Sequence, residues 1–171
     1  MQKYKERKWS GEKGKKFGKV DDPYLPRGGR HEMAVCTSCK AIYQNKRWFF
    51  DEELYRQNIN LETTHRVICP ACKKIQDHYF EGVLTLEGDF FRQHRQEIIT
   101  LLNREAERVS AKSPADRIIQ MTAENHERLV VETTTDKLAQ RLGRAVYRAY
   151  KGELDFRWSH MNKFVRVYWS R

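Results

Sequence analysis

Four cysteines carry the clearest chemical signal in the sequence. They form two Cys-X-X-Cys pairs separated by 29 residues, namely Cys36 with Cys39 and Cys69 with Cys72. Each pair is expected to form a tight turn that directs two thiolates at one point, and two such turns supply the four sulfur ligands that zinc prefers. Pro70 presets the second turn, and Lys73 is placed to offset thiolate charge. The spacing predicts a structural zinc ion with no position left open for a catalytic water.

Two other interpretations of the cysteines remain open. Two disulfides would need an oxidising compartment, and the sequence shows no secretory signal. A redox-active pair usually opens a helix within a β-α-β pattern, which the sequence does not show. His31, His65 and His78 lie near the cysteines in the sequence. Because four thiolates already satisfy the metal, we expect these histidines at the surface or behind the ligands.

The segments around the cysteines predict a zinc ribbon over residues 31–81. Residues 41–43 and 46–50 are rich in strand formers and lie between the two pairs, and residues 65–68 lead as a strand into the second pair. The chain of 171 residues is 39% hydrophobic, which is enough for a core beyond the ribbon.

Residues 82–171 predict an α+β domain. Its elements follow in the order β-α-β-β-α-β-β, with expected ranges 82–87, 89–111, 117–122, 129–134, 137–151, 153–158 and 163–169. Asp89 and the pair Thr135-Asp136 are expected to cap the two helices. The first six elements match the ferredoxin-like βαββαβ pattern, and the extra C-terminal strand is expected to extend the sheet through a hairpin. In such a fold the helices cover one face of the sheet and the other face can serve as a binding platform.

Positive charge is concentrated at both ends of the chain. The net charge is +10, and residues 1–30 hold ten Lys and Arg against four acidic residues, which predicts a flexible basic arm. Residues 31–136 hold 14 basic and 17 acidic residues, whereas residues 137–171 hold nine basic and two acidic ones. Such an arrangement favours a polyanion partner, and nucleic acid first. The candidate phosphate contacts in the arm are Lys13, Lys15, Lys16 and Lys19.

Two further surfaces are candidates for nucleic-acid binding. The second predicted helix carries a cationic stripe at steps of four, three and four residues, formed by Lys137, Arg141, Arg144 and Arg148. On the final hairpin Arg157 and Arg166 alternate with apolar residues, next to Phe164 and Tyr168. Aromatic and arginine side chains on one face are suited to base stacking, although such a face also suits a core or a protein contact.

Several functions are disfavoured by what the sequence lacks. It has no apolar run long enough to span a membrane and no apolar stretch behind its charged N-terminus, so we expect a soluble, cytoplasmic protein. It has no phosphate-binding loop, no dinucleotide-binding glycine motif and no Gly-X-Ser-X-Gly elbow. We therefore expect no catalysis, no small-molecule substrate and no membrane partner.

Three segments resemble a known family. The paired cysteines, the run from Cys69 into Glu81–Leu86, and the segment Thr133–Gly143 are similar to a group of short bacterial zinc-ribbon proteins. These in turn resemble the N-terminal region of the large-ribosomal-subunit nuclear-export adaptors. The resemblance covers about residues 31–157 and implies a ribosomal or rRNA ligand. The adaptors are longer and carry more cysteine pairs, so the resemblance does not extend to export.

The sequence thus favours a zinc-binding, non-catalytic protein that docks on rRNA or a ribosomal subunit through its basic segments. A zinc-ribbon regulator that binds DNA, and a protein-interaction adaptor that uses the terminal aromatic hairpin, are the alternatives. A nuclease is disfavoured because no carboxylate cluster with metal-binding spacing is present.

Overall fold

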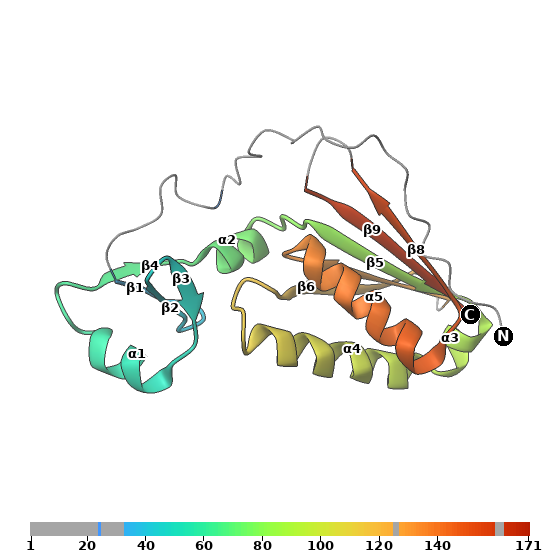
Figure 1. The fold of residues 1–171 in the computed structure, drawn as a ribbon, viewed down its shortest axis with the longest axis horizontal. Coiled ribbons are helices and arrows are strands. Elements are labelled where there is room, and N and C mark those ends of the chain that lie inside the picture. The colour runs from blue at the N-terminus through green and yellow to red at the C-terminus, as the bar shows by residue number, and fades with distance from the viewer. Residues whose placement is uncertain (1–23, 25–32, 125–126, 160–162) are drawn as a thin grey trace.

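A computed structural model describes residues 24, 33–124, 127–159 and 163–171, which form two α+β units side by side (Figure 1). The expected arm, residues 1–30, lies outside the described residues except for Tyr24. The smaller unit holds a four-stranded sheet in the order β3-β2-β1-β4, in which only the β1–β4 pair is parallel. Its elements are β1 (Ala34–Cys36), β2 (Ile42–Gln44), β3 (Arg47–Phe49), α1 (Glu52–Asn58), β4 (His65–Val67) and α2 (Pro70–Gln76).

The smaller unit confirms the expected strands and adds three elements that the sequence did not indicate, namely β1, α1 and α2. β1 has only three residues, all buried, and α1 has no buried residue. The start of α1 is nonetheless well defined, because the Asp51 side chain accepts a hydrogen bond from the Leu54 N–H, and Glu52 and Glu53 lie in the first turn.

The larger unit has the expected mixture of strands and helices. Its elements are β5 (Gly82–Glu87), α3 (Asp89–Gln93), α4 (Arg95–Ser110), β6 (Ile118–Glu124), β7 (Arg128–Thr133), α5 (Asp136–Tyr150), β8 (Glu153–Trp158) and β9 (Val165–Ser170). The Thr135 side chain caps α5 as expected by accepting a hydrogen bond from the Leu138 N–H. The first helix differs from expectation, because His94 leaves helical geometry and divides it into α3 and α4, and Gly88 rather than Asp89 is its N-cap.

The strand order of the larger sheet departs from the expected ferredoxin-like arrangement. The order is β6-β7-β5-β9-β8, so the last strand does not extend the sheet at its edge. β9 instead lies between β5 and β8 and pairs in parallel with β5, from Gly82 opposite Val165 to Glu87 opposite Ser170. The physical reason is burial: Val165, Val167 and Trp169 of β9 are almost fully buried, as an interior strand requires, whereas β8 is mostly exposed.

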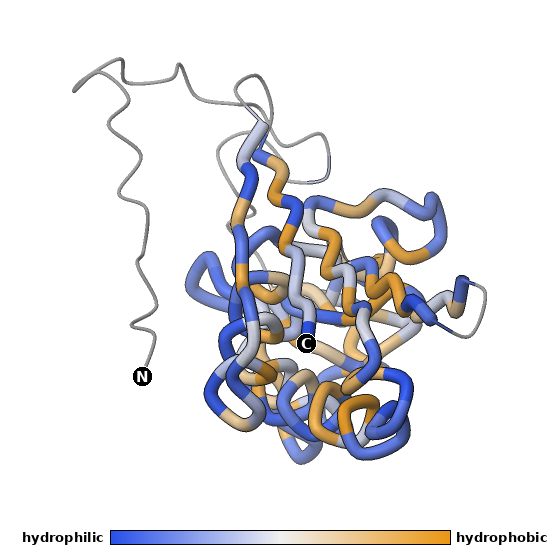
Figure 2. Tube along the Cα trace, turned by 90° about the vertical axis from the view of Figure 1, so that its right-hand side faces the viewer, coloured by the Kyte–Doolittle hydropathy of each residue, from blue (hydrophilic) through white to orange (hydrophobic). Residues whose placement is uncertain are grey.

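The main core lies between this sheet and the helices α3, α4 and α5, which cover one face of it (Figure 1). Hydrophilic and hydrophobic residues alternate along its strands, as Figure 2 shows, so that one face of each strand packs on the helices. α5 lies close to the sheet because a glycine, with no side chain, stands at each of two contacts, Gly82 on β5 and Gly143 on α5. A Cβ on Gly82 would lie 2.6 Å from the Cβ of Ala139, and a Cβ on Gly143 would lie 2.6 Å from a methyl group of Val167.

A buried ion pair lies where the two units join. Lys74 of α2 contacts Glu81 with an Nζ–Oε1 distance of 2.6 Å, and both side chains are about 95% buried. The backbone of Glu81 also extends the larger sheet, because its N–H donates to Thr133 and its carbonyl accepts from Val165. Lys163 lies 3.6 Å from the second Glu81 oxygen, which has no hydrogen bond within the described residues.

Candidate metal centre and basic surfaces

All four cysteines converge on one point, next to the ends of β1 and β4 in the smaller sheet. Their sulfur atoms lie within 4.8 Å of one another, and within the described residues no other group of metal-binding side chains gathers in this way. The Sγ–Sγ distance is 3.9 Å between Cys36 and Cys72, and 3.7 Å between Cys39 and Cys69. Three of the four side chains are buried and Cys39 is half-buried.

These distances fit a tetrahedral zinc ion. A zinc–sulfur bond of about 2.3 Å places the sulfurs of a tetrahedron about 3.8 Å apart, which agrees with the two measured separations. A disulfide would need sulfurs about 2.0 Å apart, and no cysteine pair in the structure is bonded. The four-cysteine cluster is therefore compatible with zinc binding at the predicted ligands.

Short backbone elements hold the two cysteine pairs in place. The first pair closes a turn after β1, in which the Cys36 N–H donates to Ala41 and the Lys40 N–H donates to Cys36, with Lys40 at a positive φ of 63°. The second pair opens the short helix α2, with Cys69 as its N-cap. The tight turn expected here continues as a helix because Pro70 is well placed at the first helical position. The strands β4 and β5 on either side of α2 belong to different sheets, so the segment is not a β-α-β unit of one sheet.

The cysteines perturb one another as thiols. Hydrogen bonds with the side chains of Cys39 and Cys69 lower the pKa of Cys36. The same hydrogen bonds with Cys36 raise the pKa of Cys39 and Cys69. Negative charge on one of these sulfurs therefore disfavours ionisation of its neighbours. A bound cation relieves that repulsion and releases the remaining protons.

Arg117, a residue that sequence reasoning missed, connects the metal centre to the larger unit. Its guanidinium donates to Cys72 over 3.5 Å and lies 5.7 Å from the ring centroid of Phe50. Burial acts to lower the pKa of Arg117, but hydrogen bonding and attraction to the cysteine sulfurs outweigh burial and raise it. Its backbone N–H donates to Thr134, so the larger sheet fixes its position. Arg117, rather than the exposed Lys73, thus neutralises sulfur charge.

We predict that Arg117→Met weakens zinc binding by about 10- to 100-fold, because partners behind the ligands typically contribute that much. Met keeps the length of the side chain and removes only its charge and hydrogen bonds. Zinc affinity is measured by competition with a chromophoric chelator. Arg56→Met removes an exposed arginine of the same unit, paired with Glu52, and is the control that should leave the affinity unchanged. Equal affinities for all three proteins would show that Arg117 does not support the metal centre.

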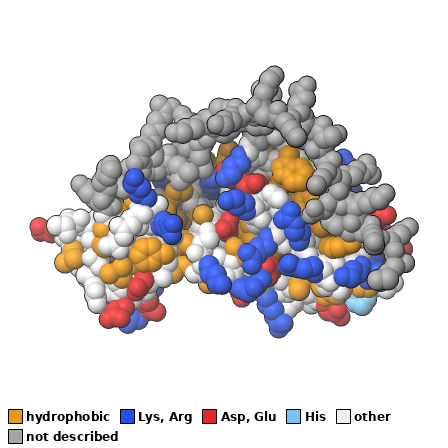
Figure 3. Space-filling model, viewed as in Figure 1, with side chains coloured by type: hydrophobic (Ala, Val, Ile, Leu, Met, Phe, Trp, Pro, Cys, Tyr) orange, Lys and Arg blue, Asp and Glu red, His pale blue; other side chains and the backbone are white. Residues whose placement is uncertain are grey.

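The predicted cationic stripe lies on the exposed side of α5, where basic side chains gather over α4 and α5 in Figure 3. Arg141 is ion-paired with Glu105 at 2.7 Å. Burial acts to raise the pKa of Glu105, but hydrogen bonds from Arg141 and Arg108 outweigh burial and lower it. Arg141 is therefore engaged within the fold. The other three residues of the stripe, by contrast, form no ion pair with any described residue. They are Lys137, Arg144 and Arg148.

Arg157 and Arg166 lie on the opposite, open face of the sheet. They are directly opposed in the β8–β9 register, an arrangement of like charges that is unfavourable. Each is engaged locally, however. Arg157 pairs with Asp155 at 2.9 Å and lies over the ring of Tyr168, and Arg166 lies over the ring of Phe164. The other predicted contacts, Lys13, Lys15, Lys16 and Lys19, lie outside the described residues, as does His31.

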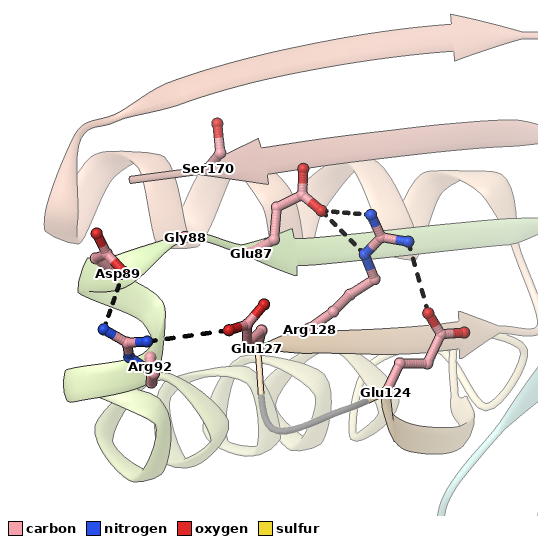
Figure 4. A pocket seen from close by; sticks show the side chains of 8 residues that line it. All are labelled: Glu87, Gly88, Asp89, Arg92, Glu124, Glu127, Arg128 and Ser170. Atoms are coloured by element: carbon pink, nitrogen blue, oxygen red, sulfur yellow. Dashed lines mark hydrogen bonds and ion pairs between the residues drawn. The ribbon is translucent and has the colours of Figure 1, made fainter.

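A cavity of about 550 Å³ opens at the end of β5 that is remote from the cysteines. Figure 4 shows that each of its two arginines is paired with carboxylates on the wall of the cavity. Arg128 lies between Glu87 and Glu124, and Arg92 lies between Asp89 and Glu127. The remaining lining residues are Gly88 and Ser170. Because both arginines are already paired with carboxylates, this cavity is best explained as a structural ion-pair network.

No protein-family model, no curated protein and no solved structure matches this chain. Across the described residues, no helix is long and apolar enough to cross a membrane. The chemistry of the cysteine centre and the placement of the charges are therefore the basis for a functional assignment.

Proposed function

We propose that this protein is a zinc-binding, non-catalytic RNA-binding protein that docks on rRNA or a ribosomal particle through the exposed side of α5. The observation that carries the proposal is that Lys137, Arg144 and Arg148 share this side without an acidic partner in the described residues. Unpaired like charges along one helix destabilise it, and a phosphate backbone relieves that repulsion. The choice of a ribosomal ligand rests on the resemblance of Thr133–Gly143 and the cysteine pairs to short bacterial zinc-ribbon proteins, which in turn resemble the N-terminal region of the export adaptors.

In this proposal the zinc centre has a structural role. Four sulfur ligands complete a tetrahedral site and leave no position for a substrate or a reactive water. The zinc would hold the smaller unit rigid against the larger one, with Arg117 as a contact between them beside the Lys74–Glu81 ion pair. RNA would then bind a surface on which the two units keep fixed positions relative to each other.

Sedimentation with purified ribosomal subunits tests the proposal. We predict binding that weakens steeply as salt rises, because each neutralised phosphate releases counterions. The variant Lys137→Gln/Arg144→Gln/Arg148→Gln should bind more weakly at every salt concentration. For single-stranded contacts, the slope of log affinity against log salt should fall by about 2 in magnitude.

A control variant that removes the same number of positive charges shows whether affinity depends on the exposed side of α5 or only on the net charge of the protein. Lys40→Gln/Lys46→Gln/Lys73→Gln removes three exposed cations from the smaller unit and should reduce affinity much less. Equal losses in both variants would contradict the assignment to α5. A preference for duplex DNA over rRNA in competition would instead favour the DNA-binding alternative.

A further inference from the structure

One aromatic pair on the larger unit is left open by the packing of α5. Phe156 and Trp158 project from the same face of β8, with ring centroids 5.7 Å apart and ring planes within 23° of parallel. Trp158 is 52% exposed, more than any other large hydrophobic side chain among the described residues. By contrast, Trp169 on the neighbouring strand is 1% exposed. An indole in this position costs solubility and contributes little to the core.

The exposure of Trp158 follows from the path of α5 across the sheet. Near its start, α5 contacts β5, where Ala139 faces Gly82. One turn later, Gly143 faces Val167 of β9 and Leu154 of β8. The helix therefore covers the beginning of β8 but has not reached this edge strand at the level of Trp158, which pairs with Val165 opposite Gly82.

Arg144 joins this aromatic pair to the cationic stripe. Its guanidinium carbon lies 5.0 Å from the ring centroid of Phe156. A guanidinium, a phenyl ring and an exposed indole thus lie in one continuous cluster, beside Lys137 and Arg148 of the same helix. The neighbouring carboxylate of Asp155 pairs with Arg157 on the opposite face of the sheet and does not neutralise the cluster.

We propose that Trp158, supported by Phe156 and Arg144, stacks on an unpaired base of bound RNA while the α5 cations contact the flanking phosphates. The inference rests on the proposed RNA-binding function and adds that the ligand is single-stranded at this position. Aromatic faces accept any base, and cations near them hold the backbone. The open sheet face fits this role less well, because Arg157 and Arg166 already cover the rings of Tyr168 and Phe164.

The test compares single-stranded and duplex RNA bound to the full-length, zinc-loaded protein. The probes are a fluorescein-labelled 12-nucleotide oligouridine and a blunt RNA duplex of 12 base pairs, followed by anisotropy. Trp158→Ala should weaken oligouridine binding by about 5- to 150-fold, the range for loss of one stacked base. Trp158→Phe should recover most of the affinity, and duplex binding should change less than twofold.

A matched control removes an equally exposed apolar side chain that is not aromatic. Leu61 is 49% exposed in the smaller unit, and Leu61→Ala should leave both affinities unchanged. Photocrosslinking of 4-thiouridine oligonucleotides to wild-type protein should yield a crosslinked peptide that contains Trp158. This measurement does not depend on the folding of any variant.

The outcomes distinguish the two proposals. If wild-type protein binds neither probe, the proposed RNA-binding function fails. If wild-type protein binds oligouridine but Trp158→Ala binds it equally well, RNA binding stands and the stacking site is wrong. Equal losses on both probes also overturn the stacking site, as does a Trp158→Ala protein that keeps RNA binding but loses a protein partner.

Discussion

Replacing Cys69 and Cys72 with serine will abolish zinc binding and unfold the smaller unit, while the larger sheet stays folded. The strands of the smaller sheet have three residues each, and the cluster around the sulfurs consists mainly of the cysteines themselves with Ala41 and Ala71. The sheet adds few other large buried side chains, chiefly Val35 and Ile42. A core of this size does not compensate for the loss of chain entropy. Structural zinc contributes about 10–16 kcal/mol of apparent binding free energy, so its loss removes the main stabilising term.

Hydrogen exchange resolves the two units separately. In the double-serine variant, or after chelation of the wild-type protein, amides of residues 34–49 and 65–67 should lose protection. Amides of β5, β7 and β9 should keep it, because their core is independent of the metal. Metal analysis should find one zinc per wild-type chain and none in the variant. Ser38→Ala, which changes the first turn without touching a sulfur, is the control. Full protection of β1 and β4 without metal would refute the prediction.

The variant Lys74→Met will lower the free energy of unfolding of the zinc-loaded protein by about 3 kcal/mol, the size expected when one partner of a buried ion pair is removed. The variant leaves the Glu81 carboxylate buried with only Lys163, at 3.6 Å and half exposed, to balance it. The penalty arises from the uncompensated charge more than from the lost contact. Urea unfolding at saturating zinc measures it.

A double variant tests this explanation. Lys74→Met/Glu81→Leu removes both charges and should recover most of the lost stability, because an apolar pair of similar volume can replace a buried ion pair. The exposed pair of Arg56 and Glu52 is the matched control, and Arg56→Met should cost about 0.5 kcal/mol or less. A double variant as unstable as Lys74→Met would indicate that Lys74 acts through packing.

The clustering of the four cysteines and most of the secondary structure were predictable because they depend on local patterns. Two Cys-X-X-Cys pairs restrict the choice of ligand strongly, and the apolar residues that alternate along β9, which are Val165, Val167 and Trp169, lie on its buried face. The break at His94 was not predictable from periodicity, because a single non-helical residue shifts the apolar positions too little. Phe91 and Ile98 remain on one side across the break and are both fully buried.

Features that depend on distant parts of the chain were missed. Arg117 lies 45 residues from Cys72 in sequence, and no local pattern relates an arginine at the start of a strand to a thiolate. The position of β9 inside the sheet depends on a comparison of two strands, β8 and β9, as partners of β5. β9 has more buried side chains than β8 and therefore takes the place next to β5. The stripe on α5 was visible in the sequence, but its division into a paired Arg141 and unpaired neighbours required the position of Glu105 on α4.

The interior position of β9 also orders events during synthesis. The ribosome releases the smaller unit first, and all four cysteines are available before β5 is complete. The parallel partner of β5, by contrast, begins at Val165, so one edge of this central strand stays unpaired while the intervening residues are made. Metal binding by the cysteines and the pairing of β9 with β5 are thus separated in time. Zinc would reach a complete set of four cysteines while the larger unit of the nascent chain is still incomplete.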